Sequence, residues 1–183
     1  MNERIPLLVL GLGNVLLEDD GVGGAAISLL LDRFEPPPDV RVFDGGTLGL
    51  SLLPYLEKSD TLILVDAVRA DGAPGTLVRL DGDDVAPAVA TRLSPHQVGV
   101  ADLLDGARWL ECYPARVVLL GLIPGSMELS LGLSRLVRAA LPELVDLIVD
   151  EAAQLGFAFE PRDPHSARAR ERVLDIARLA GTL

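Results

Sequence analysis

Short apolar runs alternate along this chain with longer segments of helical periodicity, and Gly, Pro and charged residues separate them. Short apolar runs of this kind are typical of buried strands. Strands alternating with helices predict an α/β fold, a three-layer sandwich whose twisted, mostly parallel mixed sheet is flanked by helices. The expected strands are Ile5–Leu10, Val40–Phe43, Thr61–Val65, Thr76–Leu80 and Arg116–Gly121; the expected helices are Val22–Phe34, Leu48–Glu57, Gln97–Glu111 and Leu133–Leu155.

One connection leaves no room for a helix. The strand Thr76–Leu80 follows Thr61–Val65 through a Gly/Pro-rich turn, ADGAPGT. We therefore expect these two strands to be antiparallel neighbours, which makes the sheet mixed.

The 183 residues favour one domain with a core of its own. After Gly156 the texture changes to a Pro-marked connector, FAFEPRDPHS, and a charged, helix-prone segment, Ala167–Leu179. We expect a domain over residues 1–156 and a C-terminal helical appendage over residues 157–183, to which we assign no chemistry.

Charge narrows the range of partners. The net charge of −11 disfavours nucleic acid and anionic membrane surfaces as partners. No apolar run is long enough to span a membrane, and the N-terminus does not resemble a signal peptide, so we expect a cytoplasmic protein. The single cysteine, Cys112, cannot form an internal disulfide.

The most informative stretch is GLGNVLLEDDGVG, which follows the first expected strand. Gly11 and Gly13 match the first two glycines of a dinucleotide-binding fingerprint, but Leu16 occupies the third position. Three consecutive acids, Glu18–Asp20, then precede the helix, where they would repel a phosphate and favour a cation. A nucleotide-binding protein therefore stays an alternative that only the two glycines support.

Three further groups of polar residues follow expected strands or precede a helix: Asp44–Thr47, Asp66 and Ser94–Gln97, which contains His96. In open α/β sheets, ligands bind at the carboxyl ends of the strands, so these residues could converge at one edge. Two carboxylates and a neutral imidazole would suit Ni²⁺, Zn²⁺ or Mn²⁺.

Each group also has a structural interpretation. Asp19 or Asp20 could simply complement a helix macrodipole, and Asp44 could belong to an ordinary turn. Ser94–Gln97 reads equally as a capping box in which His96 has no role. Asp66 is harder to explain in this way, since an unpaired carboxylate is costly at the end of a buried strand.

Four segments together, GLGNVLLEDDGVG, FDGGTLGLSLL, LVDAV and SPHQVGVADLL, resemble the hydrogenase maturation endopeptidases, which process the large subunit of nickel–iron hydrogenases. The resemblance extends from the first strand to about Gly156 and includes the order and spacing of the segments. It implies a twisted mixed sheet between helices, as the pattern does.

The resemblance also implies a set of site residues. The family's metal ligands fall here on Asp20, Asp66 and His96, the candidate catalytic residues. Asp20 stands where some relatives have Glu, which keeps the charge but shortens the reach. Asp44 lies beside the cleft in this family, as an accessory residue for substrate binding or catalysis.

The function implied by the resemblance is removal of a C-terminal extension from a nickel-loaded large-subunit precursor. Nickel carried by the precursor would act as the recognition element, and other divalent ions could occupy the same ligands. Hydrolysis by a carboxylate that activates water and hydrolysis through metal polarisation of the carbonyl both stay open. We expect a monomer, and the alternative is a non-catalytic nickel-binding chaperone or sensor on the same fold.

Overall fold

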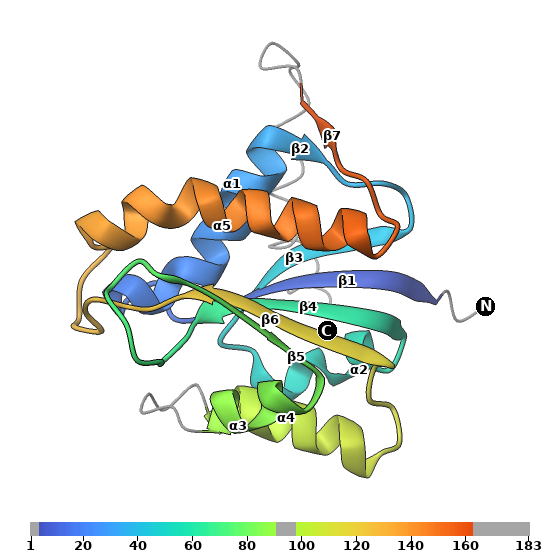
Figure 1. Cartoon of the computed structure of the whole chain (residues 1–183). Coiled ribbons are helices and arrows are strands. Elements are labelled where there is room, and N and C mark those ends of the chain that lie inside the picture. Colours follow the sequence, from blue (N-terminus) through green and yellow to red (C-terminus); the bar gives the residue numbers. More distant parts are fainter. Residues whose placement is uncertain (1–3, 91–97, 163–183) are drawn as a thin grey trace, which may run out of the picture.

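A five-stranded sheet lies between two layers of helices in the computed structural model, which describes residues 4–90 and 98–162 (Figure 1). Helices α1 (Val22–Arg33) and α5 (Arg135–Gln154) cover one face. The opposite face is covered by α2 (Leu53–Leu56), α3 (Val85–Ala90) and α4 (Val98–Trp109). The prediction of a three-layer α/β sandwich is confirmed.

The strand order of the sheet is β3-β1-β4-β6-β5. Strands β1 (Ile5–Leu12), β3 (Val40–Gly46), β4 (Ser59–Ala67) and β6 (Arg116–Leu122) are parallel. Only β5 (Leu77–Asp81) is antiparallel, and it pairs with β6. The mixed character of the sheet is therefore as predicted.

The predicted neighbour of β5 is wrong, because β6 lies between β4 and β5. Every residue of β6 after Arg116 is buried, whereas no residue of β5 is fully buried. An apolar strand buries most of its surface when it lies between two other strands, and a partly exposed strand suits the edge of the sheet. Residues 68–76 carry the chain past β6 to that edge.

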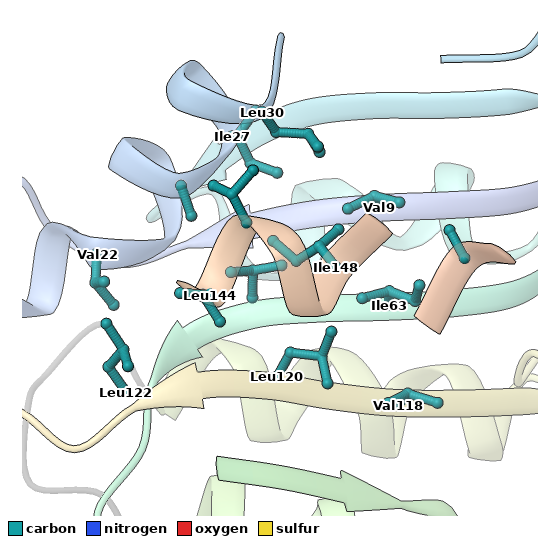
Figure 2. Close-up of a cluster of buried hydrophobic side chains, with 14 of the residues drawn as sticks. Val9, Val22, Ile27, Leu30, Ile63, Val118, Leu120, Leu122, Leu144 and Ile148 are labelled. Atoms are coloured by element: carbon teal, nitrogen blue, oxygen red, sulfur yellow. The ribbon is translucent and has the colours of Figure 1, made fainter. Parts of the chain in front are cut away.

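Two hydrophobic clusters fill the space between the sheet and the two helix layers. Alternate residues of each strand supply opposite clusters, as the pleat requires. Val9 and Ile63 face α1 and α5 (Figure 2), whereas Leu8 and Leu62 belong to the cluster on the side of α4. Ile27, Leu30, Leu144 and Ile148 complete the first cluster from the helices. No helix in the described ranges is long and apolar enough to cross a membrane.

Short elements complete the fold. The 3-10 turns are η1 (Glu18–Gly21), η2 (Gly49–Leu52) and η3 (Gly82–Asp84). Strands β2 (Phe34–Glu35) and β7 (Glu160–Pro161) form a separate antiparallel pair, so the chain just after Gly156 returns to α1. Phe159 is buried in the core there. The expected helix Ala167–Leu179 lies outside the described residues.

Candidate functional site

The candidate site lies at the carboxyl edge of the three strands β3, β1 and β4. In the sheet register, Gly11 of β1 pairs with Asp44 on one side and with Val65 on the other. Asp66 follows Val65 directly. Since neighbouring strands are about 4.8 Å apart, both aspartates lie at this edge within roughly two strand spacings of each other.

The pleat sends the two aspartate side chains to opposite faces of the sheet. Asp66 shares its face with Leu64, which packs in the cluster beneath α4. Asp44 shares its face with Val42 and lies against α1, where its Oδ2 is 2.7 Å from the position that a Cβ on Gly24 would take. Asp44 is therefore beside the Asp66 site and not within it.

Asp66 and Asp20 are both buried carboxylates with backbone contacts. Asp66 is 1% exposed, and its Oδ1 accepts a 2.6 Å hydrogen bond from the Ala67 N–H. Asp20 is fully buried in η1, which contacts β4, and its Oδ2 accepts a 2.8 Å bond from the Asn14 N–H. The fold thus keeps two acids out of water at one edge, where a cation would compensate their charge.

The glycines of the first loop serve close packing of backbone. Gly13 has φ of +125°, and a Cβ there would lie 1.8 Å from the carbonyl oxygen of Asp20. A Cβ on Gly11 would lie 2.7 Å from the carbonyl oxygen of Gly23. This packing accounts for the dinucleotide-like glycines without any phosphate.

His96, with the rest of Ser94–Gln97, lies outside the described residues, just before α4. In residues 4–90 and 98–162, no three His, Cys, Asp or Glu side chains come together closely enough to hold a metal ion. The ligand set Asp20, Asp66 and His96 therefore stays a prediction.

Asp44 borders a pocket of about 250 Å³ between α1 and the segment before α5. Its Oδ1 accepts a 2.9 Å bond from the Gly46 N–H, which holds the carboxylate at the end of β3. The other lining residues are Val15, Glu18, Gly21, Gly24, Ala25, Ser28, Gly132 and Leu133.

Sequence reasoning missed the role of Asp19. This carboxylate is fully buried and accepts three backbone N–H bonds, from Gly125 at 2.8 Å, Ser126 at 3.1 Å and Ser134 at 2.7 Å. It therefore binds a distant segment and does more than complement the dipole of α1. No sequence signal could reveal this, since its partners are backbone groups more than a hundred residues away.

The comparisons with known proteins agree with this architecture. The family model described as "Hydrogenase maturation protease" matches residues 25–151. The Hydrogenase 2 maturation protease of Escherichia coli K12 is 35% identical over 158 residues, covering 86% of this chain and 96% of that protein. The hydrogenase expression/formation protein HupD of Rhodobacter capsulatus is 39% identical over 153 residues, with 83% and 70% covered.

Solved structures give the same result. The hydrogenase maturating endopeptidase HybD from E. coli has a TM-score of 0.81 at 35% identity, covering 86% of this chain and 98% of that one. The [NiFe] hydrogenase maturation protease HybD from Thermococcus kodakarensis has a TM-score of 0.66 at 26% identity, with 80% and 99% covered. The chain belongs to the hydrogenase maturation protease family, whose members are peptidases.

Proposed function

We propose that this protein is the endopeptidase that removes the C-terminal extension of a nickel–iron hydrogenase large-subunit precursor after nickel insertion. Family membership supports the reaction class. The observation that carries the proposal is the burial of Asp20 and Asp66 at the carboxyl edge of the central strands. Buried carboxylates in that place are suited to a positively charged ligand.

The ligand would be the nickel of the precursor, held by Asp20, Asp66 and His96. Carboxylate oxygens and an imidazole nitrogen bind nickel and zinc well, so other divalent ions would compete for the same position. In this scheme the metal arrives with the substrate and identifies a precursor that is ready for cleavage. The protease supplies an incomplete ligand set, and the precursor supplies the rest.

Cleavage breaks the C–N bond of one peptide unit and adds the elements of water across it. Two routes fit the residues: a carboxylate takes a proton from the attacking water, or the metal polarises the scissile carbonyl. Asp44 is the accessory candidate for the first route, because its pocket lies beside the edge that holds Asp66. With Asp44→Asn, the carboxylate route predicts a fall in kcat at unchanged nickel dependence, whereas the metal route predicts little change.

Chain organisation and setting complete the proposal. We assign catalysis to the domain of residues 1–156 and no part in the chemistry to residues 157–183, of which residues 157–162 pack against that domain. We also propose a monomer that works in the cytoplasm.

The decisive experiment mixes purified protein with nickel-loaded and nickel-free precursor and follows the mass of the large subunit. We expect cleavage of the loaded form only. Asp20→Asn, Asp66→Asn and His96→Ala should each lower the rate at least about a hundredfold, since even outer-shell partners of a metal account for 10–100-fold effects. Asn can still accept the hydrogen bond that Asp20 accepts, so the melting temperature should change little.

Equal cleavage of the two precursor forms would contradict recognition through nickel. Binding of loaded precursor without any cleavage would instead support the chaperone or sensor alternative.

A further inference from the structure

The first loop, residues 11–21, is fastened to a segment that follows β6. This second segment, Gly125–Ser134, runs from the end of β6 to the N-terminus of α5. Backbone bonds join the two where they run alongside each other: Glu18 N–H donates to the Ser130 carbonyl, and Ser130 N–H donates to the Leu16 carbonyl, both at 3.0 Å.

Asp19 makes the strongest part of this junction. Its buried carboxylate accepts bonds from both ends of the second segment, Gly125 and Ser126 at the start and Ser134 at the finish. Bonds to an ionised acceptor are shorter and stronger than neutral ones. One side chain therefore holds both ends of Gly125–Ser134. Because Asp20 is the next residue in the chain, the same side chain links this segment to a candidate ligand.

The fastened segment borders the pocket of Asp44, beside the edge that holds Asp66. Gly132 and Leu133 line the same pocket as Asp44 and Glu18. Between the fixed ends, Leu129 and Leu131 are 82% and 78% exposed, and Leu16 across the junction is 51% exposed. Large apolar side chains that a well-bonded backbone holds in water are typical of an interaction surface.

We propose that Asp19 is a positioning residue that makes Gly125–Ser134 one wall of the substrate site, alongside the first loop, which carries Asp20. The partner is the large-subunit precursor, whose C-terminal peptide would cross the leucine-bearing wall to reach the buried carboxylates. We choose the precursor as partner because Gly132 and Leu133 of this wall also line the pocket of Asp44, the accessory candidate for cleavage. The inference rests on the proposed function.

Two variants test the role of Asp19. Asp19→Asn has the same shape but turns an amide N–H₂ toward N–H donors. Ser134→Pro leaves Asp19 intact and removes one donor; the φ of −57° at Ser134 suits proline. The Ser134 hydroxyl has no hydrogen-bond partner in the described part of the chain, so its loss should cost little.

Glu151→Gln is the matched control. Glu151 is also a buried carboxylate with ordered partners, but it binds Arg79 and Arg116 away from the candidate site. We expect Asp19→Asn and Ser134→Pro to lower kcat/KM on nickel-loaded precursor about tenfold, the effect of one charged hydrogen bond, chiefly through KM. Glu151→Gln should keep kcat/KM within a factor of about two to three at a comparable loss of melting temperature.

Leu131→Ser adds a second readout. If Asp19 acts through the wall, the loss in the double variant Asp19→Asn/Leu131→Ser will be smaller than the product of the single losses. Wild-type kcat/KM in a folded Asp19→Asn protein, or a loss no larger than that of Glu151→Gln, overturns the proposal. If Asp19→Asn does not fold, Ser134→Pro decides by the same criteria.

Amide hydrogen exchange of the free protein keeps the two proposals apart. Faster exchange at Gly125, Ser126 and Ser134 in Asp19→Asn shows that the fastening exists. If wild-type protein neither cleaves nor binds the precursor, the proposed function is wrong, and so is the assignment of Gly125–Ser134 as a wall of the substrate site. If wild-type protein cleaves and the variants cleave equally well, only the role of Asp19 fails.

Discussion

At the scale of the single residue, Gly23 and Gly24 at the start of α1 are packed against different kinds of atoms. A Cβ on Gly23 would lie 2.2 Å from the Leu12 carbonyl oxygen and 2.3 Å from that of Val65, both in the central strands. The three atoms nearest to a Cβ on Gly24 all belong to the Asp44 side chain, with Oδ2 at 2.7 Å. The backbone carbonyls around Gly23 cannot move aside without disturbing the central strands. The Asp44 side chain next to Gly24 can rotate away.

Gly23→Ala should therefore destabilise the protein by about 1–3 kcal/mol or more, as overpacking of a core does. Gly24→Ala should keep the stability, because alanine favours the helix by about 1 kcal/mol and offsets the contact. It should still lower cleavage, since Asp44 must move. Urea denaturation and precursor turnover measure the two effects, and wild-type turnover in Gly24→Ala would show that the position of Asp44 does not matter.

How much of the site the sequence reveals depends on the range of the interaction. Asp66 and Asp44 could be placed at one edge because each directly follows a recognisable strand, and parallel strands end together. Their separation onto opposite faces follows from the pleat once the register is known. Asp19 could not be assigned, since its hydrogen bonds lead to backbone groups that have no sequence pattern.

At the scale of elements, ion pairs join the edge strand β5 to its neighbours. Arg79 of β5 donates from Nε to Glu151 Oε2 at 2.6 Å, which links the strand to α5. Arg79 and Arg116 both donate to Asp81 Oδ2 at 3.0 Å, which links β5 to β6. Burial alone would raise the pKa of Asp81, but the hydrogen bonds from the two arginines outweigh it and lower that pKa.

A lowered pKa in the folded state gives a defined pH dependence. The contribution of Asp81 to stability is complete above its unfolded pKa of about 3.9 and is lost as pH falls through the lower folded value. It should not exceed about 1 kcal/mol, because the side chain is 37% exposed. Urea midpoints of wild type and Asp81→Asn should differ at pH 6 and begin to converge only as pH falls below ~4; a constant difference would contradict the argument.

Long elements could be predicted, and short ones could not. The four parallel strands and α1, α4 and α5 have periodicity over enough residues to be recognised. The two-residue strands β2 and β7 and the six-residue helix α3 have too little sequence for any period to show. The partner of β5 was missed because a Gly/Pro-rich loop indicates that the chain reverses direction. It does not indicate which strand the next segment pairs with, and here that strand is β6.

At the scale of the whole molecule, the last described residues belong to the packed domain. Phe159 is 7% exposed in the core, and Arg162 forms a 2.6 Å ion pair with Glu35. The Arg162 N–H also donates to the Arg33 carbonyl at 2.7 Å. These contacts place a suitable truncation point after Arg162, beyond the resemblance that ends at Gly156.

Removal of residues 163–183 should leave precursor cleavage and melting temperature close to those of the full chain. Truncation after Gly156 is the matched comparison, and it should cost about 3–5 kcal/mol because it deletes the buried Phe159. Calorimetry and turnover of both proteins provide the test. Lost turnover in a folded protein that ends at Arg162 would give the appendage a functional role.

The hydrogen bonds of Asp19 also determine the stage of folding at which the site can form. They join positions 106 to 115 residues apart, and contacts of such separation form late because a long loop must close first. The first loop leaves the ribosome early, yet its partner segment lies more than a hundred residues later, just before α5. A nascent or half-folded chain thus has the acids without their support. We expect proteolytic competence to arrive only with the finished fold, which would protect the cell from premature cutting.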